Sequence, residues 1–237
     1  IIVGILLIGG GFLISQATPS IFPAQASAEA GQIDNLFRIA LLIGGAIFLL
    51  VQGMLAYSVW RFRARAGDLT DGPNIHGSTT LEIIWTAIPA VIVVVLTILS
   101  YQVWTSIQTA KEDEQVVEVT GARFNWAFTY NTPDPRDTVQ NLAVKSNELH
   151  TYIGRPVRLE MHTQDVIHAF WVPAMRIKQD VIPGRTTEYR FTPVEVTGET
   201  YPARYPIKCA ELCGAEHGNM IAWVVVHQTE DDYTAWF

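Results

Sequence analysis

Both cysteines of this chain lie in one short loop that also carries other soft metal ligands. Between Cys209 and Met220 the loop holds the second cysteine, Cys213, together with Glu211 and His217. Thiolate and thioether sulfur are soft ligands that favour copper. One Cys, one Met and two His would form a mononuclear copper site, whereas a second Cys provides two sulfur atoms able to bridge two copper ions.

A binuclear copper site needs one more imidazole than this loop supplies. His217 follows Cys213 by four residues and can ligate one copper, while Met220 lies three residues further and can act as a weak axial ligand. The best candidate for the remaining ligand is His168, at the end of a predicted strand in the segment Asp165–Pro173. Ligands from a distant strand and a single loop are typical of copper sites on β-sandwiches.

Three other interpretations are compatible with the same residues. In an oxidising compartment, Cys209 and Cys213 could form a disulfide. Two Cys and two His could instead bind structural zinc, although zinc gives no role to Met220. His168 could also be an ordinary core histidine, since only its sequence context distinguishes it.

Two long apolar segments without a charge precede the polar half of the chain. They cover Ile39–Trp60, with 22 residues, and Ile83–Ile107, with 25 residues. Each is long enough to cross the hydrocarbon layer of a membrane as a helix. Aromatic side chains near the segment ends fit an interfacial belt: Tyr57, Trp60, Trp85, Tyr101 and Trp104. The sequence therefore predicts a transmembrane helix hairpin within residues 33–110.

Positive charges predict the orientation of this hairpin. Arg61, Arg63 and Arg65 directly follow the first apolar segment. By the positive-inside rule, the connecting loop then lies in the cytoplasm. Residues from Lys111 onward consequently lie on the outer side of the membrane, periplasmic or lumenal.

The first 28 residues allow two interpretations. Ile1–Ser15 is apolar and rich in glycine, and residues 23–28 resemble a signal-peptidase site. The segment is therefore either a signal sequence or a third transmembrane helix. We favour the retained helix.

From Lys111 onward, apolar residues recur with the period of two that is typical of half-buried strands. Short strands are predicted at residues 116–120, 124–130, 157–162, 187–191 and 221–227, with turns rich in Pro and Gly between them. About 127 residues of evenly spaced strands favour a single β-sandwich or Greek-key barrel over residues 111–237.

The net charge of −7 restricts the class of partner. It argues against a nucleic acid, because nothing in the chain would neutralise the phosphates. It fits a basic protein that docks on the extramembrane half. The expected partners are therefore a lipid membrane and a soluble protein.

Four motifs, in this order, closely resemble subunit II of the cytochrome c oxidases, in the heme-copper oxidase superfamily. They are Glu82–Ala90, the segment around His168, Lys178–Arg185 and the loop Cys209–Met220. The resemblance extends over residues 33–227. It implies an α+β membrane protein in which the helix hairpin precedes an extramembrane cupredoxin-like Greek-key β-barrel.

The resemblance also implies a binuclear Cu(A) centre in the outer domain. Two cysteines would bridge the copper ions, two histidines would cap them, and a methionine and a backbone carbonyl would complete one copper each. In this chain these residues are Cys209, Cys213, His168, His217, Met220 and Glu211. The Glu211 side chain would reach a magnesium or manganese ion shared with subunit I.

In this family such a centre accepts electrons from cytochrome c or a similar small soluble carrier and passes them to heme in subunit I. Oxygen is reduced to water there, coupled to proton translocation, so no catalytic residue is expected in this chain. Quinol oxidases of the superfamily lack the copper ligands, whereas all six positions are present here. The alternative functions are a membrane-anchored copper storage or delivery protein, and an oxidase subunit whose loop holds zinc or a disulfide.

Two carboxylates outside the loop have both a functional and a structural interpretation. Glu82 matches a family glutamate at the mouth of a proton-uptake channel into subunit I, but Thr79–Glu82 also forms a capping-box pattern at a helix start. Asp165 matches an acidic residue of the family's cytochrome docking patch, and could equally be a solvated loop charge.

The largest departure from the family pattern lies at Phe124 and Trp126. The family usually has two tryptophans there, and the first is where electrons enter. Trp126 matches the second tryptophan, while Phe124 replaces the first, so Phe124 or a neighbouring aromatic residue would take that role. Similar replacements in bacterial members favour a bacterial source. The remaining histidines match no ligand motif and are expected to be structural or exposed: His76, His150, His162 and His227.

Overall fold

The computed structural model describes residues 2–64, 66, 67, 72, 74, 76–130 and 143–237. Arg65, one of the three arginines that predict the orientation of the hairpin, lies outside the described residues. The chain forms two compact units, one from residues 1–18 and 34–103 and one from residues 19–33 and 104–237. The division of the chain into the predicted segments 1–28, 33–110 and 111–237 stays a prediction.

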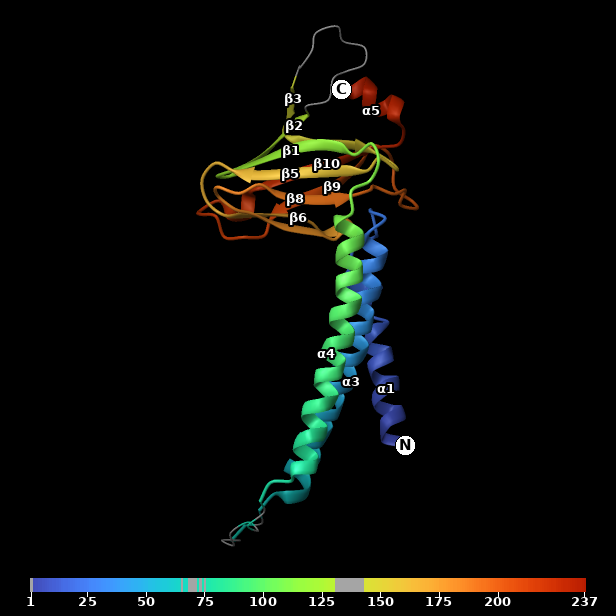
Figure 1. The fold of residues 1–237 in the computed structure, drawn as a ribbon, viewed down its shortest axis with the longest axis vertical. Coiled ribbons are helices and arrows are strands. Elements are labelled where there is room, and N and C mark those ends of the chain that lie inside the picture. Colours follow the sequence, from blue (N-terminus) through green and yellow to red (C-terminus); the bar gives the residue numbers. More distant parts are fainter. Residues whose placement is uncertain (1, 65, 68–71, 73, 75, 131–142) are drawn as a thin grey trace. The chain divides into compact units, whose positions relative to one another are not determined.

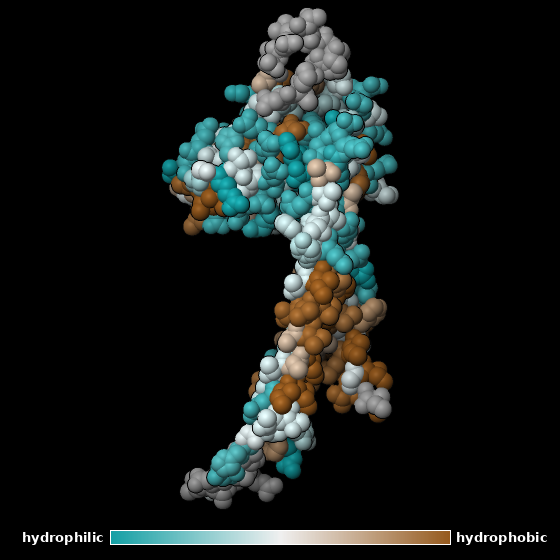
Figure 2. All heavy atoms as spheres, viewed as in Figure 1, coloured by the Kyte–Doolittle hydropathy of each residue, from teal (hydrophilic) through white to brown (hydrophobic). Residues whose placement is uncertain are grey.

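Long apolar helices dominate the first unit. They are α1 (Ile2–Ser15), α3 (Ala30–Phe62) and α4 (Thr79–Gln108), with a short α2 (Thr18–Ile21) after the first. At about 1.5 Å per residue, α3 and α4 each exceed the ~30 Å thickness of a bilayer core. Among the described residues, three helical segments are long and apolar enough to span a membrane. Figure 2 shows their hydrophobic surface, and the two predicted spans lie within α3 and α4.

Glycine brings α1 into close contact with α3. A Cβ atom on Gly11 would lie 2.4 Å from the carbonyl oxygen of Leu42, and one on Gly45 would lie 3.3 Å from Cα of Gly11. Small residues allow membrane helices to approach in this way. A hydrogen bond of 3.3 Å from Arg38 to Gln16 joins the same two segments. Thus α1 packs as a third helix of this unit, and its retention in the mature protein stays a prediction.

The second unit is a β-sandwich of two five-stranded sheets (Figure 1). The first sheet has the order β3 (Val144–Ser146), β2 (Asn125–Tyr130), β1 (Gln115–Ala122), β5 (Val157–Thr163), β8 (Thr187–Phe191). The second has the order β4 (Glu148–Tyr152), β10 (Ile221–His227), β9 (Ala203–Cys209), β6 (His168–Val172), β7 (Ile177–Val181). The short helices are η1 (Pro173–Met175), η2 (His217–Asn219) and α5 (Glu230–Trp236).

All five predicted strands are present, as β1, β2, β5, β8 and β10, and the last two have the predicted bounds. The sequence did not predict β3, β4, β7 and β9. Both sheets are mixed, because β1 pairs with β5 and β4 pairs with β10 in parallel, whereas the other pairs are antiparallel.

Aromatic side chains fill the space between the sheets beside the metal-ligand candidates. The ring of Phe170 on β6 lies 5.3 Å from that of Trp126 and 6.4 Å from that of Phe128, both on β2. All three are buried. Full burial of one such side chain contributes about 2–3 kcal/mol, so this cluster fixes β6 against the opposite sheet.

A segment before α3 belongs to the sandwich, which the sequence did not predict. Ala26 donates its N–H to the carbonyl of Ala174 at 2.8 Å, and Ser27 forms an isolated bridge with Pro193. Glu29 is buried and lies 2.5 Å from the ammonium group of Lys111. The unit that holds the sandwich therefore includes chain that precedes residue 111.

Candidate metal centre

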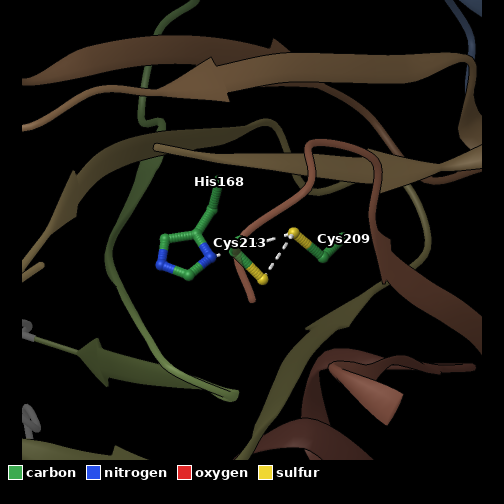
Figure 3. Close-up of side chains that lie close together, drawn as sticks. All are labelled: His168, Cys209 and Cys213. Atoms are coloured by element: carbon green, nitrogen blue, oxygen red, sulfur yellow. Dashed lines mark hydrogen bonds between the residues drawn. The ribbon is translucent and has the colours of Figure 1, made fainter. Parts of the chain in front are cut away.

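Two free cysteines form the centre of the candidate site. Cys209 is the last residue of β9, Cys213 lies four residues later, and their Sγ atoms are 3.9 Å apart. With His168, the first residue of β6, they form a buried group whose ligand atoms lie within 4.8 Å of one another (Figure 3). A disulfide requires about 2.05 Å between sulfur atoms, so both thiols are available to a metal.

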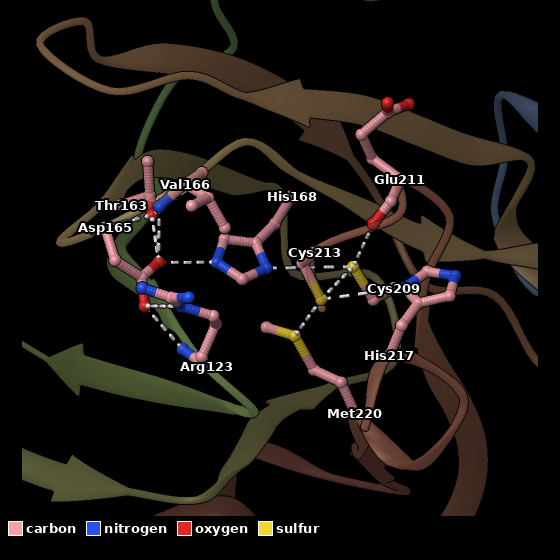
Figure 4. A network of polar contacts seen from close by, with 10 residues as sticks. All are labelled: Arg123, Thr163, Asp165, Val166, His168, Cys209, Glu211, Cys213, His217 and Met220. Carbon is pink, nitrogen blue, oxygen red and sulfur yellow. Dashed lines mark hydrogen bonds and ion pairs between the residues drawn. The ribbon is translucent and has the colours of Figure 1, made fainter. Parts of the chain in front are cut away.

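An imidazole and a carbonyl oxygen flank the sulfur of Cys209. Nδ1 of His168 lies 3.8 Å from Sγ, and the backbone oxygen of Glu211 lies 3.3 Å from it. The carboxylate of Glu211 points away from the sulfur atoms (Figure 4) and is exposed. Glu211 therefore presents its backbone to this site and leaves its side chain for another contact.

A second imidazole and a thioether flank the sulfur of Cys213 (Figure 4). Nδ1 of His217 in η2 lies 3.6 Å from Sγ, and Sδ of Met220 lies 3.8 Å from it. Met220 is fully buried, whereas His217 is half-buried. The structure thus brings together all six donors predicted from the sequence.

Backbone contacts hold the loop between β9 and β10 beside the start of β6. The N–H of Cys209 donates to the carbonyl of Met220 at 3.2 Å, and that of Ala210 donates to Ala169 at 3.0 Å. Gly214 has a φ of 140°, which favours glycine. A Cβ atom there would lie 3.0 Å from the ring of Phe124, so this glycine also permits close contact with the start of β2.

Burial favours a neutral Cys213 thiol before a metal binds. Burial raises the pKa of Cys213 to about 11, and the neighbouring Cys209 thiol adds to the shift. A bound cation reverses this preference, because metal ligation requires thiolates and releases their protons. The donor set of two sulfurs, two imidazoles, a thioether and a carbonyl fits copper, since soft sulfur ligands and imidazole both suit it.

Asp165 faces His168 instead of extending into solvent. Oδ1 of Asp165 accepts a hydrogen bond of 2.8 Å from Nε2 of His168, and Oδ2 accepts one of 2.8 Å from the N–H of Arg123. Burial alone would raise the pKa of the Asp165 carboxyl, but these bonds and one from the N–H of Val166 hold that pKa well below its ordinary value. The sequence analysis did not predict this contact, for which the spacing of three residues was the available signal.

The other predicted residues lie in different environments. Phe124 is half-buried beside the loop, whereas Trp126 is only 2% exposed and its ring lies 5.8 Å from that of His168. Glu82 lies in the first turn of α4 in the helical unit, with an exposed side chain. Its N–H donates to the carbonyl of Ser78 at 3.0 Å.

Fold and site together define a class of protein: a chain with helices long and apolar enough to span a membrane and with a β-sandwich that carries a buried group of sulfur and imidazole ligands. Comparison with models of protein families identifies the family. Residues 15–103 match the model of the cytochrome c oxidase subunit II transmembrane domain, and residues 124–228 match that of its periplasmic domain. The chain belongs to the cytochrome c oxidase subunit II family.

Two curated relatives support the same assignment. Cytochrome c oxidase subunit 2 of Synechocystis sp. is 36% identical over 263 residues, covering 91% of this chain and 74% of the relative. That of Thermostichus vulcanus is 36% identical over 270 residues, covering 91% and 77%. The solved periplasmic domain of subunit II from Bradyrhizobium japonicum is 23% identical, with a TM-score of 0.44, covering 54% of this chain and 94% of that one.

Family membership confirms the predicted fold class, membrane location and general role. The protein is a multi-pass membrane subunit of a cytochrome c oxidase, an oxidoreductase complex, and its cupredoxin-like C-terminal domain lies outside the membrane. It is the electron-accepting subunit of that complex.

Proposed function

We propose that the six donors hold two copper ions as a Cu(A) centre. Bound there, the pair of ions supplies a carrier for one electron at a time. The observation that supports this proposal is the pair of buried sulfur atoms 3.9 Å apart, each flanked by its own imidazole. A mononuclear site would need only one of the two thiolates, and zinc would leave the buried sulfur of Met220 without a role.

We also propose that Glu211 serves two metal sites. Its backbone oxygen faces Cys209, while its exposed carboxylate points away from the sulfur atoms. A carboxylate is a suitable ligand for magnesium or manganese. We assign it to such an ion at the contact with subunit I.

The proposed electron donor is cytochrome c or a similar small soluble carrier. A net charge of −7 favours a basic protein of this kind. Phe124 is the proposed point where electrons enter, because it is partly exposed and its ring packs against Gly214, next to Cys213. Trp126 is buried, and its ring lies 5.8 Å from that of His168, so it would act from inside the domain. The electrons then pass to heme in subunit I, where oxygen is reduced and protons are translocated.

Glu82 is the proposed entrance for protons on the opposite side of the membrane. Its exposed side chain at the start of α4 would face water or subunit I, so it could supply protons to a channel there. Replacing Glu82 with Gln should slow proton uptake by the assembled oxidase without changing the copper content of this chain.

The copper proposal is tested on the full chain, purified in detergent and loaded with copper. We expect two copper ions per chain and an electron spin resonance spectrum in which one unpaired electron couples equally to two copper nuclei. Cys213→Ser should reduce the content to one copper with a mononuclear spectrum, whereas Leu212→Ser, in the same exposed loop, should change neither. One copper per chain, a preference for zinc, or copper without the shared electron would reject the proposal; the last result would favour copper storage or delivery.

A further inference from the structure

The environment of Asp165 does not match that of a docking charge. Only 22% of its side chain is exposed, and both oxygens are engaged. Oδ1 accepts from Nε2 of His168 at 2.8 Å and from the N–H of Val166 at 2.7 Å. Oδ2 accepts from the N–H of Arg123 at 2.8 Å. These bonds restrain the carboxylate and direct it at one ring of the metal site.

This contact determines which nitrogen of His168 can bind a metal. An ionised carboxylate only accepts hydrogen bonds, so the proton of the neutral ring resides on Nε2. Nδ1 is then unprotonated, and it is the nitrogen 3.8 Å from the sulfur of Cys209. His168 is fully buried, and the Asp165 carboxylate is the hydrogen-bond partner of Nε2.

We propose that Asp165 is a positioning residue for His168, and that it tunes the copper affinity and reduction potential of the site. This inference rests on the proposed copper function. A carboxylate on the far nitrogen of a ligating imidazole orients the ring and makes it a stronger donor. A stronger donor stabilises the more positive oxidation state, so Asp165 lowers the reduction potential.

The same carboxylate connects the copper site to the proposed donor contact. Arg123 precedes Phe124, and its Nε atom also lies 3.4 Å from Oδ2 of Asp165. A Cβ atom on Gly214 would lie 3.6 Å from Cδ of Arg123. Thus Arg123 contacts both Asp165 and the loop that carries the cysteines, and Asp165 fixes the backbone at the start of β2 relative to His168.

The test compares Asp165→Asn with the wild-type full chain, both loaded with copper in detergent. Asn preserves size and can still accept a hydrogen bond from Nε2, but it removes the negative charge. We expect copper affinity to fall about 10- to 100-fold and the reduction potential to rise. A tenfold change in the preference for the reduced state equals about 59 mV for one electron. Asp165→Glu keeps the negative charge, so its copper affinity and reduction potential should lie between those of Asp165→Asn and the wild type.

A matched control separates positioning from docking. Asp231→Asn makes the same change at an exposed acid in α5 and should leave potential and affinity unchanged. If Asp165→Asn alters only the KM for a basic donor protein, and high salt abolishes that effect, Asp165 is a docking charge and the inference is wrong. If the wild type binds two coppers while Asp165→Asn has the same potential and spectrum, the inference fails and the copper function stands. A wild type without two coppers would overturn both.

Discussion

Two histidine sites occupy the same five-stranded sheet, and only one of them has the environment of a metal ligand. His168 on β6 has a carboxylate on one nitrogen and a sulfur near the other. His150 on β4 and His227 on β10 face each other, with 3.0 Å between Nδ1 of His150 and Nε2 of His227. All three are buried. Burial and imidazole alone therefore do not identify a ligand; the distinguishing features are soft donors and a partner that fixes the tautomer.

The second site instead anchors the C-terminal helix. The ring of Trp236 in α5 stacks on that of His150, with 3.6 Å between centroids and an interplanar angle of 7°. Tyr233 contacts the edge of His227 and accepts a hydrogen bond of 2.7 Å from the Gln115 side chain. The capping box of Thr229 and Asp232 starts the helix. In this site histidine is a packing residue that stays neutral.

The largest expected effect is the loss of copper affinity when a histidine is replaced in the first site and not in the second. His168→Asn should lower copper affinity by more than about 100-fold, because losing a ligand exceeds the loss of an outer-shell partner. His227→Asn should leave copper content unchanged and reduce only thermal stability. Copper titration and thermal unfolding of both full-length variants check this. Equal copper loss in the two variants would mean that the contrast drawn between the sites is wrong.

Lower pH should reduce the stability that the His150 and His227 pair contributes to the fold. Burial and the neighbouring His227 lower the pKa of His150 to about 4, against a partial opposing effect of Glu148, and burial lowers the pKa of His227. The unfolded chain, with a histidine pKa near 6.5, therefore binds protons more readily than the folded one. The contribution of these neutral histidines to the free energy of unfolding is fully present above about pH 6.5. It falls as the pH drops toward 4, by at most about 3 kcal/mol for His150.

Unfolding experiments between pH 7 and pH 4.5 measure this loss. The variant His150→Gln cannot take up the proton and should show a flatter pH dependence, while starting from a lower stability. An unchanged slope in His150→Gln would assign the acid sensitivity to other groups.

The grouping of the donors in the loop could be predicted from the sequence because its information is local. Cys209, Cys213, His217 and Met220 occupy twelve consecutive residues, and ligand type with spacing is sufficient to relate them. His168 could be added from its context. Asp165 was predicted from the family resemblance to be a docking residue or a solvated loop charge. Its position three residues before His168 was the only local signal of the contact between them.

The parts that the sequence did not predict depend on contacts between distant segments. His150 meets His227 only because β4 and β10 pair in parallel, with His150 opposite Val225 and Tyr152 opposite His227. Strand β9 carries Pro206 in its interior and charged residues on its exposed face, which weakens the strand pattern. The burial of Glu29 beside Lys111 joins segments 82 residues apart, and neither segment alone indicates it.

A smaller effect is expected where α5 covers the histidine pair. Trp236→Ala removes the stacked ring over His150 and should cost about 1.5 kcal/mol, without changing copper content. The pKa of His150 should also move up toward its ordinary value, because the ring becomes more exposed. Histidine ring resonances followed by NMR during a pH titration of the full chain measure the pKa of His150 in the wild type and in the variant. A large loss of copper in this variant would show that the two sites are coupled.

The smallest expected effect concerns the backbone behind His168. A Cβ atom on Gly121 would lie 3.1 Å from Cζ3 of Trp126 and 3.3 Å from Cδ2 of His168. Either ring must therefore shift by a few tenths of an ångström in Gly121→Ala, at a cost of about 1 kcal/mol. We expect a small change in the copper spectrum, since the His168 ring then meets the metal at a different angle. Gly218→Ala, where a Cβ atom meets nothing within 4 Å, should leave the spectrum unchanged. Identical spectra for both variants would show that Trp126 yields and that Asp165 holds His168 in place.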